Sequence, residues 1–96
     1  MVHVSMASLW EIAIKTRIGK LEADPAEIAG AIEASGFLML PIRVAHLLAV
    51  HRLPALDGHR DPFDHLLVAQ AREESLMLVS QDARLARYGV EVMPCG

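Results

Sequence analysis

The chain has 96 residues and a net charge of −3 at pH 7, and 53% of its residues are hydrophobic. Its length predicts one small domain over residues 1–96, and its acidic balance excludes a protein that holds nucleic acid through a broadly basic surface alone. No apolar run approaches the roughly 18 residues of a membrane span, so we expect no membrane partner.

Strands and helices alternate along the predicted chain. Hydrophobic spacing, N-cap residues and glycine stops define these elements. In chain order we expect a strand at 2–5, a helix from Ser5 to about Arg17, a helix from Asp24 to Gly36, a strand at 37–40, a helix around 43–52, a helix at about 62–74, a strand at 76–80, a short helix at 81–89 and a strand at 90–94. The alternation favours a parallel sheet covered by helices on both faces. We expect the apolar strand 37–40 to be buried on both sides.

Two aspartates stand three residues apart around a proline at the start of the helix 62–74. Asp61 directly precedes Pro62, an order typical of an N-cap followed by the first helical residue. Asp64 falls in the first turn, where a carboxylate interacts favourably with the helix dipole. Each aspartate alone therefore has a structural explanation.

Three acidic residues from separate segments are expected to converge at one edge of the sheet. Functional sites of such folds lie at the carboxyl ends of the strands. Glu11 lies in the helix that leaves strand 2–5, Asp64 opens the helix before strand 76–80, and Asp82 follows that strand by two residues. Clustered carboxylates are typical ligands of Mg²⁺ or Mn²⁺, which can activate water against a phosphodiester. Structural alternatives remain open: Glu11 can pair with Lys15, and Asp82 can cap the short helix.

The histidines and the cysteine indicate no further site. The histidines lack the spacing of a zinc site, so we expect them to be surface or partly packed groups: His3, His46, His51, His59 and His65. The single cysteine, Cys95, excludes an internal disulfide, which fits a reducing cytoplasm.

Three segments together resemble one known family. The segment VSMASLWEIAIKTRIGKL resembles the region around the second acidic residue of PIN-domain proteins, and HRDPFDHLLVAQA with LMLVSQDARLARYGVEVM resembles their carboxy-terminal half. The closest similarity is to VapC-type toxins of bacterial toxin–antitoxin pairs. The resemblance implies a three-layer α/β/α fold with a mostly parallel sheet, and a Mg²⁺- or Mn²⁺-dependent endoribonuclease. By motif, Glu11, Asp64 and Asp82 match the catalytic and metal-binding acids, and Asp61 belongs to the same metal site as cap and outer-shell residue.

The chain departs from the family at its start. PIN proteins typically begin with an apolar strand that ends in an aspartate, whereas Met1 falls where their second strand begins. We therefore expect a PIN-like fold without the family's first strand, with weak or absent nuclease activity. Unpaired strand edges would favour a homodimer or higher oligomer. An in-frame upstream segment ending in aspartate would indicate a wrongly assigned start instead.

Two functions follow from this resemblance. The first is an endoribonuclease of the toxin type, with RNA as substrate, an antitoxin protein as partner, and Arg60, Arg84 or Arg87 near the phosphates. The second is a non-catalytic PIN-like module that oligomerises or binds an antitoxin. The hydrophobic excess of the composition supports the second.

Overall fold

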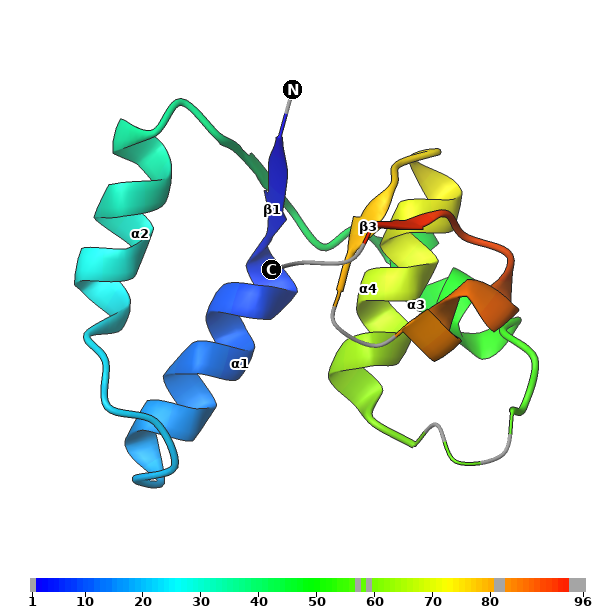
Figure 1. Ribbon diagram of the computed structural model, residues 1–96, viewed down its shortest axis with the longest axis horizontal. Helices are drawn as coiled ribbons and strands as arrows, with labels where there is room; N and C mark the ends of the chain where they lie inside the picture. Colours follow the sequence, from blue (N-terminus) through cyan, green and yellow to red (C-terminus); the bar gives the residue numbers. More distant parts are fainter. Residues whose placement is uncertain (1, 57, 59, 81–82, 94–96) are drawn as a thin grey trace. The chain divides into compact units, whose positions relative to one another are not determined.

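The structure, a computed structural model, describes residues 2–56, 58, 60–80 and 83–93 (Figure 1). The chain divides into two compact units, Met1–Ile42 and Arg43–Gly96. Both units combine short parallel strands with helices, as the alternating sequence predicts. The described part of the chain contains no helix with the length and apolar character that crossing a bilayer requires.

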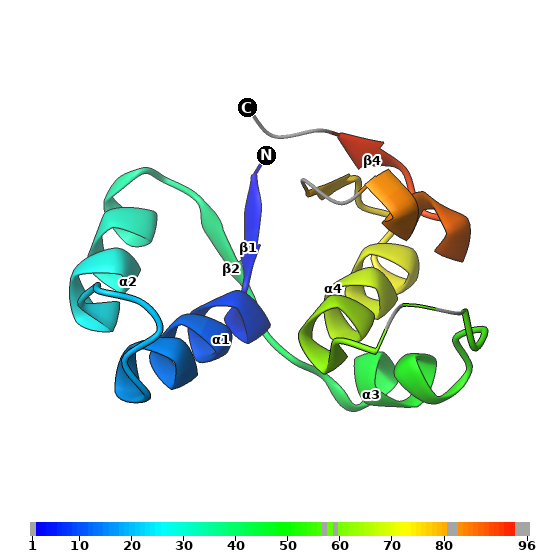
Figure 2. The same cartoon turned by 60° about the horizontal axis from the view of Figure 1, so that its bottom comes forward.

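The first unit consists of two strands and two helices. Its elements are β1 (His3–Ser5), α1 (Met6–Arg17), α2 (Pro25–Ala34) and β2 (Leu38–Leu40). Strands β1 and β2 pair in parallel, with His3 opposite Leu38 and Ser5 opposite Leu40. Figures 1 and 2 show α1 continuing directly from β1, so α1 begins at the carboxyl end of that strand.

Local capping explains where the helices of the first unit begin. The Ser5 hydroxyl accepts a hydrogen bond from the Ala7 backbone N–H at 3.0 Å. The Asp24 carboxylate accepts one from the Ala26 N–H at 2.9 Å, and Pro25 stands at the first helical position. These bonds satisfy amide groups that have no partner inside a helix. The predicted starts of both helices are therefore confirmed.

The second unit places two helices against a strand pair and a 3₁₀ helix. Its elements are α3 (Val44–His51), α4 (Pro62–Glu73), β3 (Leu78–Val79), η1 (Ala83–Tyr88) and β4 (Val92–Met93). Strand β3 pairs in parallel with β4, with Leu78 opposite Val92. Helix α3 packs along α4. The unit therefore has its own core and its own parallel ladder.

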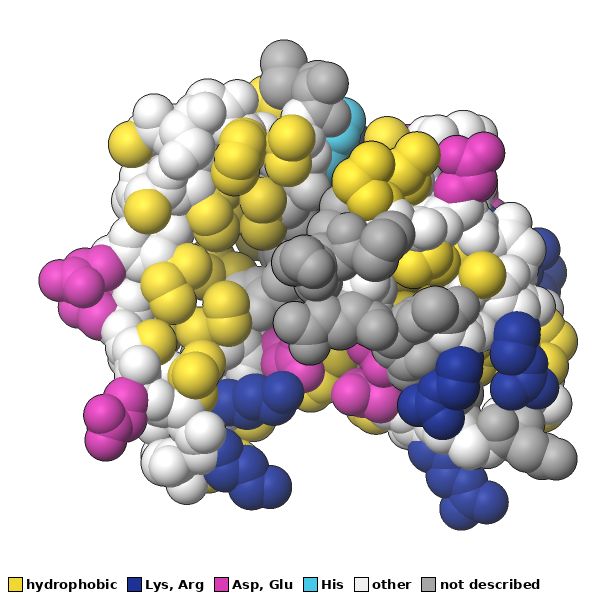
Figure 3. All heavy atoms as spheres, in the orientation of Figure 1, with side chains coloured by type: hydrophobic (Ala, Val, Ile, Leu, Met, Phe, Trp, Pro, Cys, Tyr) yellow, Lys and Arg dark blue, Asp and Glu magenta, His cyan; other side chains and the backbone are white. Residues whose placement is uncertain are grey.

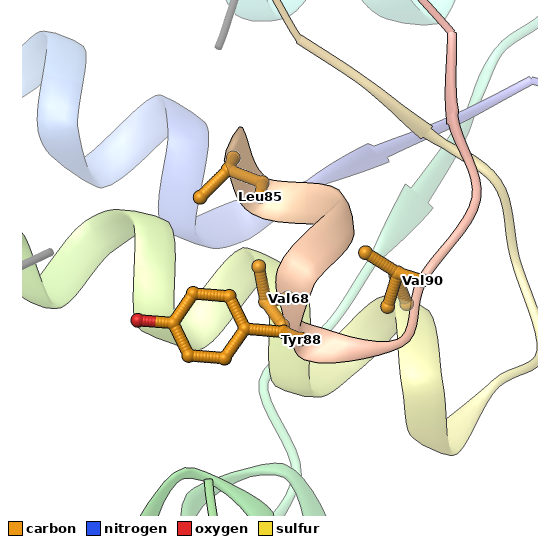
Figure 4. Close-up of a cluster of buried hydrophobic side chains, with 5 residues drawn as sticks. Val68, Leu85, Tyr88 and Val90 are labelled. Carbon is orange, nitrogen blue, oxygen red and sulfur yellow. The ribbon is translucent and has the colours of Figure 1, made fainter. Parts of the chain in front are cut away.

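Buried side chains from α4, η1 and the segment that follows η1 form that core. Val68 of α4 contacts Leu85 and Tyr88 of η1 together with Val90 (Figure 4). Ala71 completes the buried cluster, and partly buried side chains surround it: Leu53, Leu56, Leu78 and Val92. This packing fixes η1 against α4.

Some predicted details differ from the structure. Each unit contains one two-stranded ladder, the predicted strand 76–80 is reduced to β3, and within 90–93 the strand is β4, whereas residue 94 lies outside the described residues. The predicted short helix at 81–89 is a 3₁₀ helix over Ala83–Tyr88, and residues 81 and 82 lie outside the described residues. Burial of strand 37–40 on both faces is wrong, because Phe37 is 41% and Leu38 is 47% exposed. A strand is completely buried only where packed layers cover both faces of its sheet.

Candidate metal and active site

The first turn of α4 holds two of the predicted acids. The Asp61 carboxylate accepts a hydrogen bond from the Phe63 backbone N–H at 2.8 Å, and Pro62 follows at the first helical position. The interpretation of Asp61 as the N-cap is therefore confirmed. This bond ties the Asp61 side chain to the helix start, so the cap and the first turn form one local unit.

Asp64 lies at the third position of α4 and is half-buried. Residues three apart at a helix start lie on neighbouring positions of one face, so Asp61 and Asp64 present two carboxylates at the same end of α4. The positive end of the helix dipole stabilises negative charge there. Together these features place two carboxylates at the N-terminus of α4.

Glu11 lies in the middle of α1 and forms an ion pair within its own helix. Its Oε2 lies 2.9 Å from Nζ of Lys15, four residues on, and the Glu11 side chain is 24% exposed. The predicted pairing with Lys15 is confirmed. A pair of this spacing on a helix surface contributes only about 0.3–0.5 kcal/mol.

Convergence of the three acids remains a prediction. Glu11 belongs to the first unit and Asp64 to the second, and Asp82 lies outside the described residues. Within the ranges that the structure describes, no three His, Cys, Asp or Glu residues form a group that could hold a metal ion. The structure thus brings Asp61 and Asp64 together on one helix start and leaves the complete acid set to experiment.

One histidine was missed by the sequence analysis. His46 is completely buried, so the expectation of a surface or partly packed group is wrong for this residue. Its Nε2 lies 2.9 Å from Oε1 of Glu74, and its Nδ1 accepts a hydrogen bond from the Arg43 backbone N–H at 3.0 Å. The sequence signal was the spacing of Gln70 in α4 and Glu74 at its C-cap, four residues apart, whose side chains both contact this ring. His46 is therefore a structural link between α3 and α4.

The other histidines agree with the expectation where they are described. His3 and His51 are exposed and His65 is half-buried, whereas His59 lies outside the described residues. A pocket of about 60 Å³ also lies between α3 and α4, lined by Ala49, Arg52, Leu53, Ala69, Arg72 and Glu73. Its lining residues on α4, Ala69, Arg72 and Glu73, belong to the carboxy-terminal half of that helix, so the pocket is separate from the first turn that carries Asp64.

Comparison with known families identifies the fold. The model of the PIN domain family matches residues 1–91. The chain belongs to the PIN domain family. Membership generally indicates a nuclease, and PIN nucleases act on nucleic acid and generally use divalent metals. The small α/β fold with parallel strands agrees with this assignment. No curated protein matches the chain.

The cap of α4 in this PIN domain gives a first prediction. Asp61→Ala is expected to lower the free energy of unfolding by about 1 kcal/mol, because the Phe63 N–H loses its acceptor. Asp61→Asn is expected to retain most of the stability, since asparagine caps helices equally well. Urea denaturation followed by circular dichroism measures both. Equal losses in the two variants would show that the capping bond is not the source of the effect.

Proposed function

We propose that this PIN domain is a divalent-metal-dependent endoribonuclease of the VapC toxin type, in which Glu11, Asp64 and Asp82 are the catalytic and metal-binding carboxylates. The observation that supports the proposal most is the family match over residues 1–91, a range that contains all three acids and Asp61. A nuclease of this family needs several carboxylates for its metal, and these residues lie in the segments that resemble the family's acidic motifs.

The donor set suits the proposed cation. Carboxylate oxygens are hard ligands, and Mg²⁺ and Mn²⁺ prefer such ligands over the nitrogen and sulfur donors of zinc sites. When bound, the ion supplies charge neutralisation at the scissile phosphate and makes water a stronger nucleophile. Asp64 would hold the ion from a helix turn whose backbone is fixed by the Asp61 cap. Glu11 would reach the ion by exchanging its partner Lys15.

The toxin type carries further expectations about partners. It implies single-stranded or structured RNA as the substrate, an antitoxin protein that restrains the activity, a cytoplasmic location and a homodimer or higher oligomer.

Glu11 provides a direct test of the acid set. In the presence of Mn²⁺, Glu11→Gln is expected to slow cleavage of a labelled RNA at least about tenfold, because a neutral amide is a poorer metal ligand than a carboxylate. EDTA is expected to stop the wild-type reaction. Glu33→Gln serves as the matched control, since Glu33 is an exposed residue of α2. Equal rates for wild type and Glu11→Gln would remove Glu11 from the site.

A second function is favoured by one feature of α3. Val44, Leu47 and Leu48 lie at helical spacing and are 71%, 54% and 55% exposed. Such a stripe is more typical of a protein interface than of a solvated surface. In this alternative the chain is a non-catalytic module that pairs with a second copy or with an antitoxin. Intact RNA after incubation with Mn²⁺, together with a stable dimer in sedimentation, would favour the alternative.

A further inference from the structure

The arginines of η1 are arranged on one side of that helix. A 3₁₀ helix has three residues per turn, so residues three apart lie on the same face. Leu85 and Tyr88 are 1% and 3% exposed and pack against Val68 of α4 (Figure 4). Arg84 and Arg87 have the same spacing and are exposed. The buried pair therefore fixes η1, and the arginine pair forms its outer face.

A ring contact joins η1 to the first turn of α4. The Tyr88 ring meets the ring of His65 edge to face, with 6.0 Å between the centroids and 69° between the planes. His65 directly follows Asp64 in the sequence. Since the core packing holds Tyr88 in place, this contact fixes η1 against the first turn of α4. Figure 3 shows basic side chains gathered over η1 and toward the segment that leads into α4.

We propose that Arg84 and Arg87 form a clamp for two phosphates of single-stranded RNA, and that this clamp holds the RNA backbone beside Asp64. The inference rests on the proposed ribonuclease function and adds how the substrate is held. Three residues of a 3₁₀ helix rise about 6 Å, which is close to the separation of consecutive phosphates in an extended strand. The clamp gives a chain of net charge −3 a local means of holding an anion.

The choice of arginine fits this role. Every basic residue after Lys20 is an arginine, and the second unit contains no lysine. The planar guanidinium group binds phosphate oxygens with two parallel hydrogen bonds, which a lysine ammonium cannot do. Arg72 of the same unit is less suited, because it lies in the last turn of α4, away from Asp64.

Salt-dependent RNA binding tests the clamp directly. Binding of a fluorescent single-stranded RNA is measured by anisotropy in EDTA, so that no cleavage occurs, for the full chain and its variants. For the double variant Arg84→Gln with Arg87→Gln, the slope of log K against log salt is expected to fall by about 1.4, or about 0.7 per lost phosphate contact. Affinity near about 0.1 M salt is expected to fall at least about tenfold. The control Arg72→Gln keeps both values.

Two outcomes would overturn the clamp. One is an unchanged salt slope in the double variant, and the other is no binding of RNA by the wild type at low salt. Circular dichroism and thermal melting confirm that the variants are folded, which is expected because both arginine side chains are exposed.

Cleavage assays with Mn²⁺ separate failure of the clamp from failure of the proposed function. The clamp predicts that the double variant raises KM and changes kcat by less than about twofold, because uniform binding affects KM alone. If the wild type binds RNA but does not cleave it, the ribonuclease function is rejected. The salt slope of the double variant still tests the clamp in that case. Cleavage by the double variant with an unchanged KM and an unchanged slope would reject the clamp and leave the ribonuclease function in place.

Discussion

Replacing Asp64 by asparagine is expected to reduce metal-dependent RNA cleavage more than about 100-fold and to weaken Mn²⁺ binding at least about tenfold. Loss of an outer-shell partner of a metal already costs roughly 10–100-fold in affinity or activity, and loss of a direct carboxylate ligand costs more. Asparagine has nearly the same volume and fits the first turn of α4. Calorimetric titration with Mn²⁺ and cleavage of a labelled RNA measure the two effects.

The stability of the Asp64→Asn variant is expected to stay close to that of the wild type. Removing a negative charge from the first turn of a helix costs about 0.3–1 kcal/mol through the helix dipole. Glu91→Gln is the matched control, because it removes one exposed carboxylate from the same unit. Tight Mn²⁺ binding that survives Asp64→Asn would exclude Asp64 as a ligand and leave only its role at the helix start.

Helix starts were predictable because their causes lie within three or four residues. Ser5, Asp24 and Asp61 each accept a hydrogen bond from an amide two residues further on. The Glu11–Lys15 ion pair is local in the same way, since the partners are one helical turn apart. For such features both partners lie within a few residues of each other in the sequence, so residue type and spacing suffice to predict the interaction.

Strand lengths were harder to predict because a strand is defined by its partner. The apolar run 76–79 begins two residues before β3, yet among the described residues the ladder pairs only Leu78 and Val79 with Val92 and Met93. Backbone bonds from Leu78 N to Glu91 O and from Ser80 N to Met93 O bracket this short ladder. Apolar character alone gives no information about where the partner strand ends.

The candidate site also has one part that local sequence predicts and one part that depends on distant segments. The first turn of α4 is a local feature, and its acids were found from the order of Asp61, Pro62 and Asp64. Convergence with Glu11 depends on the arrangement of segments more than 50 residues apart in the sequence. Topology gives a reason to expect such convergence at a sheet edge, and the metal titration supplies the direct test.

His46→Ala is expected to lower the free energy of unfolding by about 2–4 kcal/mol. The ring is completely buried, so its removal leaves a cavity. It also removes the acceptor of the Arg43 N–H at the start of α3 and the contact with Glu74 at the end of α4. Broken buried hydrogen bonds and cavities are among the few mechanisms that produce losses of this size.

Two further substitutions separate the causes of this loss in urea denaturation experiments. His46→Asn keeps an acceptor within reach of the Arg43 N–H and loses the link to Glu74, so it is expected to recover about 1 kcal/mol relative to alanine. His51→Ala removes an exposed histidine from the same helix and is expected to change stability by less than about 0.5 kcal/mol. If His46→Ala were as mild as His51→Ala, the bonds from His46 would not hold α3 to α4, and side-chain packing between the two helices would have to account for their association.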